Sequence, residues 1–185
     1  KSKKITFTPT LPKKKLDAFN EVKVWDGFKA FISFKEKFYP TFVDFIIHPE
    51  TDGQISYYDA AFGQTSHEHI LGLFAVGKPA KTYGEFNEND LKKYLLDELD
   101  EIFDGQASAN YLQHTSKHWS KEPYIGCAYI SDFSAPKSVK SLQKPIDNKL
   151  FFAGDGYTQG RDWGNVHNAI NSAKQSVHQM LKEQK

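Results

Sequence analysis

Short apolar runs in the first half of the chain predict a β-sheet. Residues 28–34, 42–47, 55–60 and 70–76 have the length and the β-branched or aromatic content of strands. Asp52 and Gly53 form a turn signal between two of these runs. Because the four strands follow one another closely, we expect an antiparallel meander. A further strand is predicted near residues 113–119, and a short one at residues 5–7.

Apolar positions at helical spacing predict three helices. The first spans about residues 12–22, with Pro12 in its first turn, and its run of three lysines at 13–15 is interpreted as a solvated helix start. The second is capped by Asn87 and ends at Gly105. The third follows Gly164, and one of its faces is apolar. That face consists of Val166, Ala169, Ile170, Ala173, Val177 and Leu181.

Residues 107–149 carry a weaker signal, and three prolines at 123, 136 and 145 indicate irregular structure there. Residues 150–153 then predict a short buried strand that leads into a polar, glycine-rich turn before the last helix. We interpret these elements together as an α+β fold, in which a mostly antiparallel sheet is flanked by helices.

Composition excludes several classes of protein. The 185 residues contain 24 Lys and Arg against 23 Asp and Glu, so bulk positive charge for nucleic-acid binding is absent. The single cysteine, Cys127, excludes an internal disulfide and a cysteine-based zinc site. No apolar run approaches the roughly 20 residues of a membrane helix. The sequence does not identify the compartment, and the cytoplasm is slightly favoured.

The turn after the strand at residues 150–153 is the first candidate for ligand chemistry. It is not a dinucleotide fingerprint, because Gln159 stands where that motif needs a glycine. Asp155 leaves a strand end, where a carboxylate can accept hydrogen bonds from a sugar or polyol. The helix that starts at Gly164, Asn165 and Val166 offers free N–H groups to an electron-rich atom. A strand–turn–helix with Asp155 as a capping residue is an equal alternative.

Lys29 is a second candidate, because it alternates with Phe31 and Ser33 along a strand. A lysine on a half-buried face can orient water. A strand-edge lysine that points to solvent is the simpler alternative. Two histidine pairs, at 67 and 69 and at 114 and 118, lack the spacing of a metal motif and are interpreted as surface or core residues.

Five segments in one order resemble the C-terminal half of the flavin-containing amine oxidases, the monoamine and polyamine oxidase family. They are residues 5–12, ITFTPTLP; 27–39, from GFK to KFY; 71–77, LGLFAVG, with the following helix; 119–124, WSKEPY; and 150–155, LFFAGD, with 164–170, GNVHNAI. The resemblance implies a substrate-domain portion at residues 1–110. It implies that residues 111–185 are the C-terminal part of an FAD-binding domain, including its last strand and helix.

The resemblance also implies roles for individual residues. Lys29 would hold a water near the flavin, Trp119 would pack beside the flavin, and Tyr129 would form one wall of an aromatic substrate cage. Asp155 would bind the ribityl chain, and the Val166 amide would face the pyrimidine edge. The implied cofactor-binding set is Gly154, Asp155, Gly164, Asn165 and Val166.

Three departures from the family pattern refine these expectations. Asn165 replaces the second cage tyrosine of monoamine oxidases. Ala128 occupies the covalent-flavin position, with Cys127 one residue earlier, so noncovalent FAD is predicted. No Rossmann glycines are present for the ADP half of FAD, so the chain is predicted to be a fragment whose N-terminal half is missing.

The predicted activity is that of an FAD-dependent amine oxidase, which converts an amine to an imine and reduces O2 to hydrogen peroxide. The fragment alone is expected to be inactive. Its expected partners are an amine, O2 and the missing N-terminal half. Another flavin oxidoreductase of the superfamily, of the desaturase or protoporphyrinogen type, is the first alternative. A non-catalytic module that binds a ligand or a partner is the second.

Overall fold

The computed structural model describes residues 5–43, 52–131, 134–158 and 164–183 of the chain. The chain divides into two compact units. We call Asp26–Cys127 the sheet unit, and Lys1–Trp25 with Ala128–Lys185 the helical unit. These bounds differ from the predicted division between residues 110 and 111. The strand directly after residue 110 pairs inside the sheet unit, and the first helix packs in the helical unit.

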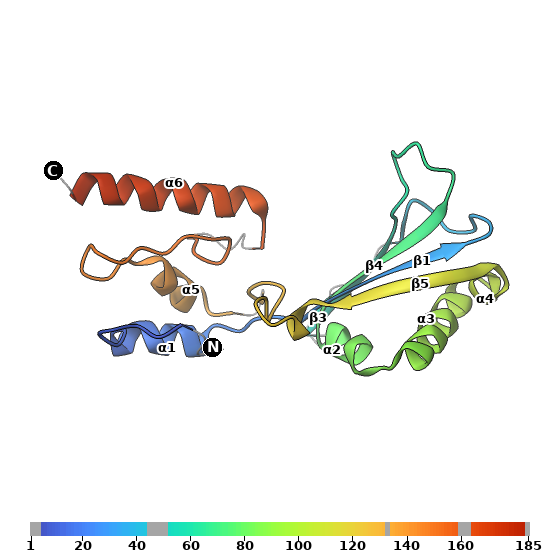
Figure 1. Ribbon diagram of the computed structural model, residues 1–185, viewed down its shortest axis with the longest axis horizontal. Coiled ribbons are helices and arrows are strands. Elements are labelled where there is room, and N and C mark those ends of the chain that lie inside the picture. Colours follow the sequence, from blue (N-terminus) through green and yellow to red (C-terminus); the bar gives the residue numbers. More distant parts are fainter. Residues whose placement is uncertain (1–4, 44–51, 132–133, 159–163, 184–185) are drawn as a thin grey trace. The chain divides into compact units, whose positions relative to one another are not determined.

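Five strands of the sheet unit form one antiparallel sheet in the order β2-β3-β4-β1-β5 (Figure 1). Their bounds are β1 Gly27–Phe34, β2 Phe42–Val43, β3 Gly53–Asp59, β4 His69–Gly77 and β5 Tyr111–His118. Each was predicted within a few residues, although residues 44–47 of the second predicted strand lie outside the described residues. The simple meander is wrong, because β1 pairs with β4 and not with β2. β2 has only two described residues, whereas β4 supplies a partner for all eight residues of β1.

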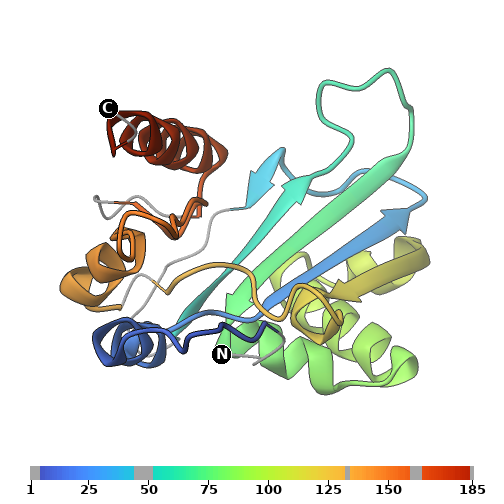
Figure 2. The same ribbon diagram turned by 60° about the vertical axis from the view of Figure 1, so that its left-hand side comes forward.

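Helices cover one face of this sheet, as Figures 1 and 2 show for α2 and α3. The helices of the unit are α2 Lys78–Glu85, α3 Glu88–Ile102 and α4 Gln106–Asn110, followed by the 3-10 helix η2 Trp119–Lys121. Asn87 caps α3 as predicted, since its side chain accepts a hydrogen bond from the Asp90 amide at 3.0 Å. α2 was not predicted. Pro79 stands in its first turn, where proline is favoured, but a proline directly after a predicted strand equally indicates a break.

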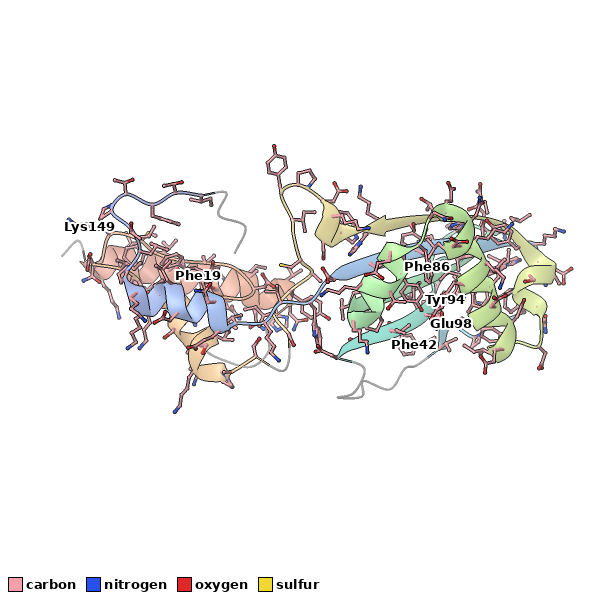
Figure 3. All side chains as sticks on the ribbon, turned by 90° about the horizontal axis from the view of Figure 1, so that it is seen from below. Phe19, Phe42, Phe86, Tyr94, Glu98 and Lys149 are labelled. Carbon is pink, nitrogen blue, oxygen red and sulfur yellow. The ribbon has the colours of Figure 1, made fainter. Side chains whose placement is uncertain are left out.

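The main core lies between the sheet and α3. Alternate residues of β1, from Phe28 to Phe34, point into it and meet the buried face of α3, which includes Leu95 and Leu99. Phe86 and Tyr94, which are neighbours in Figure 3, pack beside this core with their ring centroids 4.8 Å apart. The other alternate residues of β1 therefore lie on the opposite face of the sheet, which we call the open face.

The helical unit contains α1 Lys13–Glu21, α5 Pro136–Gln143 and α6 Val166–Glu183. Ala18 of α1 packs with Val139 and Leu142 of α5 in a small second core. The predicted strands at residues 5–7 and 150–153 are not formed, and Leu150 makes only an isolated bridge to Ile146. A strand requires a hydrogen-bonded neighbour, and the described part of the unit supplies none. With this correction, the predicted α+β class is confirmed.

Lys15 contradicts the interpretation of residues 13–15 as a solvated run. Its side chain is only 5% exposed, and its ammonium donates hydrogen bonds to the carbonyls of Ser141, Leu142 and Lys144 at the end of α5. Lys14, one residue earlier, is exposed. The predicted helix is therefore correct, but one of its lysines joins α1 to α5.

α6 packs in an orientation that its sequence pattern did not predict. Ser172 and Ser176 are its buried residues, and their hydroxyls donate to the carbonyls of Tyr157 at 2.6 Å and Phe152 at 2.8 Å. The opposite side carries an apolar stripe in which every side chain is at least half exposed. This α6 stripe consists of Val166, Ile170, Val177 and Leu181. None of the described helices is both long enough and apolar enough to span a bilayer.

Candidate functional site

Lys29 lies on the open face of the sheet near two aromatic rings. Its Nζ donates to the hydroxyl of Tyr58 at 3.3 Å. The same atom lies 5.5 Å from the ring centroid of Tyr58 and 5.4 Å from that of Phe74, distances at which a ring attracts a cation. Lys29 is half-buried, as its alternation with Phe31 suggested. Three strands, β1, β3 and β4, therefore supply one cation and two aromatic walls on a single face.

Trp119 stands at the end of β5, the strand beside β1. It opens η2 and is partly exposed. The hydroxyl of Ser120 accepts a hydrogen bond from the Gly27 amide at 3.0 Å, which fastens this turn to the start of β1. The structure thus places Trp119 next to the beginning of the strand that carries Lys29.

The helical unit brings Tyr129 against the loop before α6. Gly164 has φ +83°, and a Cβ on it would lie 3.1 Å from two carbons of the Tyr129 ring. Trp25 also contacts Tyr129. The two rings meet edge to face at 5.9 Å, and the Trp25 amide donates to the Tyr129 carbonyl at 2.9 Å. A side chain at position 164 would require both a strained backbone and a shift of Tyr129.

Asp155 lies on a turn that is fixed to α6. The turn closes through a 3.1 Å hydrogen bond from the Tyr157 amide to the Gly154 carbonyl. Ser172 of α6 accepts from the Gly154 amide at 3.4 Å and donates to the Tyr157 carbonyl. Burial, and secondarily the charge of Asp155, raise the pKa of the Tyr157 hydroxyl.

Asn165 and Val166 form the start of α6. Asn165 stands directly before the helix, and its carbonyl accepts a hydrogen bond from the Ala169 amide at 3.2 Å. Val166 is the first residue of the helix, so its amide has no acceptor within α6 and lies at the positive end of the helix dipole.

These features suit the flavin that the resemblance implies. A carboxylate with acceptor capacity suits a polyol chain, and a helix N-terminus suits an electron-rich ring edge. Gly164 leaves backbone accessible where a side chain would not fit. Lys29 and Trp119 belong to the sheet unit, whereas the remaining predicted residues belong to the helical unit. Those are Tyr129, Gly154, Asp155, Gly164, Asn165 and Val166.

Three histidines that the sequence analysis assigned to two separate pairs line the same cleft. This cleft has a volume of about 420 Å³ and lies on the sheet unit. His67, His69 and His114 contribute to it, together with Phe31 and Ser33 of β1. Among the described residues, no group of three or more His, Cys, Asp and Glu side chains is arranged to hold a metal ion. His118 lies elsewhere and packs edge to face on Phe28 at 6.3 Å.

Sequence reasoning missed Tyr58 and Phe74, the two aromatic partners of Lys29. The alternation of strand residues places Tyr57 and Tyr58 on opposite faces. Which face also carries Lys29 depends on the pairing of β1 with β4, and no local pattern in the sequence reveals that pairing.

Comparison with known proteins identifies the class. The family model for flavin containing amine oxidoreductases matches residues 1–181. The chain therefore belongs to this family, as its motifs predicted, and membership implies a flavin cofactor.

The chain is similar to curated members of different kinds. It is 27% identical over 175 residues to polyamine oxidase 2 of Arabidopsis thaliana. This alignment covers 93% of the present chain and 34% of that protein. It is 24% identical over 157 residues to lysine-specific histone demethylase 1B of Mus musculus. That alignment covers 82% of the present chain and 19% of the other protein. The chain thus spans only 19% and 34% of the length of these two relatives.

Solved structures show the same fold at lower identity. Cyclohexylamine oxidase from Brevibacterium oxydans IH-35A matches with a TM-score of 0.71 and 16% identity. A putrescine oxidase variant redesigned at its cofactor site matches with a TM-score of 0.77 and 14% identity. Each alignment covers 97% of this chain and 40% of the other.

Proposed function

We propose that this chain is the C-terminal part of an FAD-dependent amine oxidase. The observation that carries the proposal is the position of Lys29. Its ammonium is held on the open face of the sheet by the Tyr58 hydroxyl, beside the rings of Tyr58 and Phe74. A half-buried cation with aromatic walls can orient a water molecule and can stabilise negative charge that develops close to it.

Bound FAD would accept a hydride from the amine and pass the electrons to O2, giving an imine and hydrogen peroxide. The residues of this chain contribute position and charge. Lys29 holds water and supplies the positive charge. Trp119 offers a flat apolar surface for packing, and Tyr129 provides one wall for the amine.

The helical unit provides the proposed cofactor contacts. Asp155 accepts hydrogen bonds from the ribityl hydroxyls, and the Val166 amide, preceded by Gly164 and Asn165, faces the electron-rich edge of the ring. Gly154 allows the turn that presents Asp155. The flavin is bound noncovalently, since Ala128 stands at the attachment position of the family.

The exposed α6 stripe supports the proposal that a further part of the protein packs here. Four apolar side chains along one helix face are at least half exposed, while the small polar face is buried. Residues 151–153 also have no strand beside them within the described residues. An N-terminal half that supplies a sheet would cover the stripe, pair with this segment and hold the ADP portion of FAD.

The test uses the full-length protein with the Lys29→Met change, which keeps an apolar stem and removes the charge. Dithionite reduces the bound flavin, and rapid mixing with O2 follows the return of the oxidised spectrum. We expect about a 10-fold slower return, equivalent to about 1.4 kcal/mol of barrier, with normal flavin content. Lys35→Met, which changes an exposed lysine just beyond β1, is the matched control and should match the parent.

Amine oxidation is tested by peroxide release with putrescine and cyclohexylamine, the amines in the names of the structural neighbours, and with longer polyamines. A full-length protein that neither contains flavin nor takes it up would overturn the proposal. So would parent rates of reduction and reoxidation in Lys29→Met, because the sheet lysine would then have no chemical role.

A further inference from the structure

We propose that Tyr58 is a positioning residue for Lys29, and that Gly72 is a glycine because the ring of Tyr58 lies across it. The expected effect of Tyr58 on turnover rests on the proposed function. The effect of Tyr58 on the position of Lys29 is measured independently of activity.

The sheet register sets the three residues in their places. β3 pairs Tyr58 with Gly72 of β4, and β4 pairs Gly72 with Phe31 of β1. Lys29 lies two positions from Phe31, on the same face of β1. Two strand spacings of about 4.8 Å each therefore separate the backbone of Tyr58 from that of β1. The tyrosine ring must cross β4 for its hydroxyl to reach the lysine.

The crossing is possible because position 72 has no side chain. A Cβ on Gly72 would lie 2.5 Å from Cζ, 2.8 Å from Cε2 and 2.9 Å from the hydroxyl oxygen of Tyr58. Contacts this short do not occur in folded proteins, so even an alanine would displace the ring. The backbone itself does not demand glycine here, since Gly72 is not among the residues with positive φ. The space occupied by Tyr58 is the physical reason for the glycine.

The contact leaves the lysine with donors for other ligands. An ammonium has three N–H donors, and the Tyr58 hydroxyl accepts one of them at 3.3 Å. The ring centroids of Tyr58 and Phe74 lie 5.5 and 5.4 Å from the same ammonium. Within the described residues, the bond to Tyr58 is the hydrogen bond that the Lys29 ammonium makes, so two donors remain for water or another ligand. The bond to Tyr58 fixes where the lysine presents its charge and any water it binds. The hydroxyl hydrogen of Tyr58 is in turn available to an acceptor on the open face.

The placement is tested with trace acetylation in the full-length flavoprotein. Lysines are labelled at low extent with isotopic acetic anhydride, and mass spectrometry gives the reactivity of Lys29 relative to the exposed Lys35. Tyr58→Phe keeps the ring and removes the acceptor, whereas Gly72→Ala displaces the ring. Both should raise the relative labelling of Lys29 about 3-fold or more, because the amine is no longer held. Tyr124→Phe, at a side chain that is 94% exposed, should leave it unchanged.

Turnover then separates this inference from the proposed function. If both hold, Tyr58→Phe slows flavin reoxidation, and Tyr58→Phe combined with Lys29→Met is no slower than Lys29→Met alone, as expected for residues that act as one unit. If Lys29→Met reacts at the parent rate, the role of the lysine fails, and the labelling still decides whether Tyr58 positions it. Unchanged Lys29 labelling in Tyr58→Phe would overturn the inference, even if Gly72→Ala failed to fold.

Discussion

Replacing Lys15 with methionine tests the buried cation that joins α1 to α5. Its Nζ lies 3.0 Å from the carbonyl oxygen of Ser141, 2.5 Å from that of Leu142 and 2.6 Å from that of Lys144. It also lies 3.9 Å above the ring of Phe152. The last carbonyls of a helix have no intrahelical donor and carry its negative dipole end, so a cation there stabilises α5.

The expected loss follows from these contacts. A hydrogen bond from a charged group contributes roughly 1.5–3 kcal/mol, and a carbonyl left buried without a partner costs roughly 1–3 kcal/mol. The bonds to Ser141 and Lys144 are only partly buried, so water can replace much of them. The Leu142 carbonyl is bonded in a buried position and carries most of the penalty. Because methionine preserves the apolar stem, we expect Lys15→Met to lower the unfolding free energy by about 3 kcal/mol.

Thermal unfolding followed by circular dichroism at pH 7 provides the measurement. Burial lowers the pKa of the Lys15 ammonium to about 8, so the group is still charged at that pH. For a chain of this size, about 3 kcal/mol corresponds to a Tm lowered by roughly 6–12 °C. Lys14→Met makes the same chemical change at an exposed neighbour and should stay within about 0.5 kcal/mol. Equal effects of the two substitutions would refute the reasoning.

Three further predictions concern pH and the cofactor. Burial raises the pKa of the Tyr57 and Tyr83 hydroxyls, which donate to Glu98 at 2.8 and 2.7 Å. The contribution of these two hydroxyls to the free energy of unfolding is complete below the unfolded pKa of about 10 and is lost as pH rises above it. Urea titrations from pH 9 to 11 should therefore show falling stability, and the fall should be less steep in Tyr83→Phe. Burial lowers the pKa of His118, so the folded state favours the neutral ring, and stability should fall as pH drops below about 6.5, less steeply in His118→Phe. Acid precipitation of the flavoprotein should leave the yellow colour in the supernatant, whereas a yellow pellet would show that Cys127 binds the flavin covalently.

The strands could be predicted because their signal is local. Local β-prone runs marked each of the five strands within a few residues, and the cap at Asn87 marked α3. The missed helices α2 and α5 share one cause. Pro79 and Pro136 each stand in the first turn of a helix, where proline is favoured, but a proline after a strand or a loop equally indicates a break. Which of the two applies depends on what the following residues pack against.

The sequence could predict only those residues of the candidate site that a local pattern marks. Lys29 was found because it stands at the head of an apolar strand and alternates with Phe31 and Ser33. The turn at Asp155 was found because it joins a strand signal to a helix signal. Tyr58 and Gly72 were missed, because their relation to Lys29 passes through two strand pairings. The position of β1 beside β4 joins residues 35 to 49 positions apart in the chain, and periodicity over a short window cannot reveal that pairing.

α6 shows how a correct pattern can lead to a wrong packing partner. Its apolar residues do fall on one face, as their spacing predicts, but the helical unit buries the opposite face through Ser172 and Ser176. Two serine hydroxyls bonded to carbonyls fix the position of the helix and contribute little hydrophobic free energy. Burying the side chains of the α6 stripe would contribute roughly 1.5–3 kcal/mol each. The apolar periodicity of α6 is therefore explained if the stripe forms its core with the proposed N-terminal half, while the serine face sets the turn that presents Asp155.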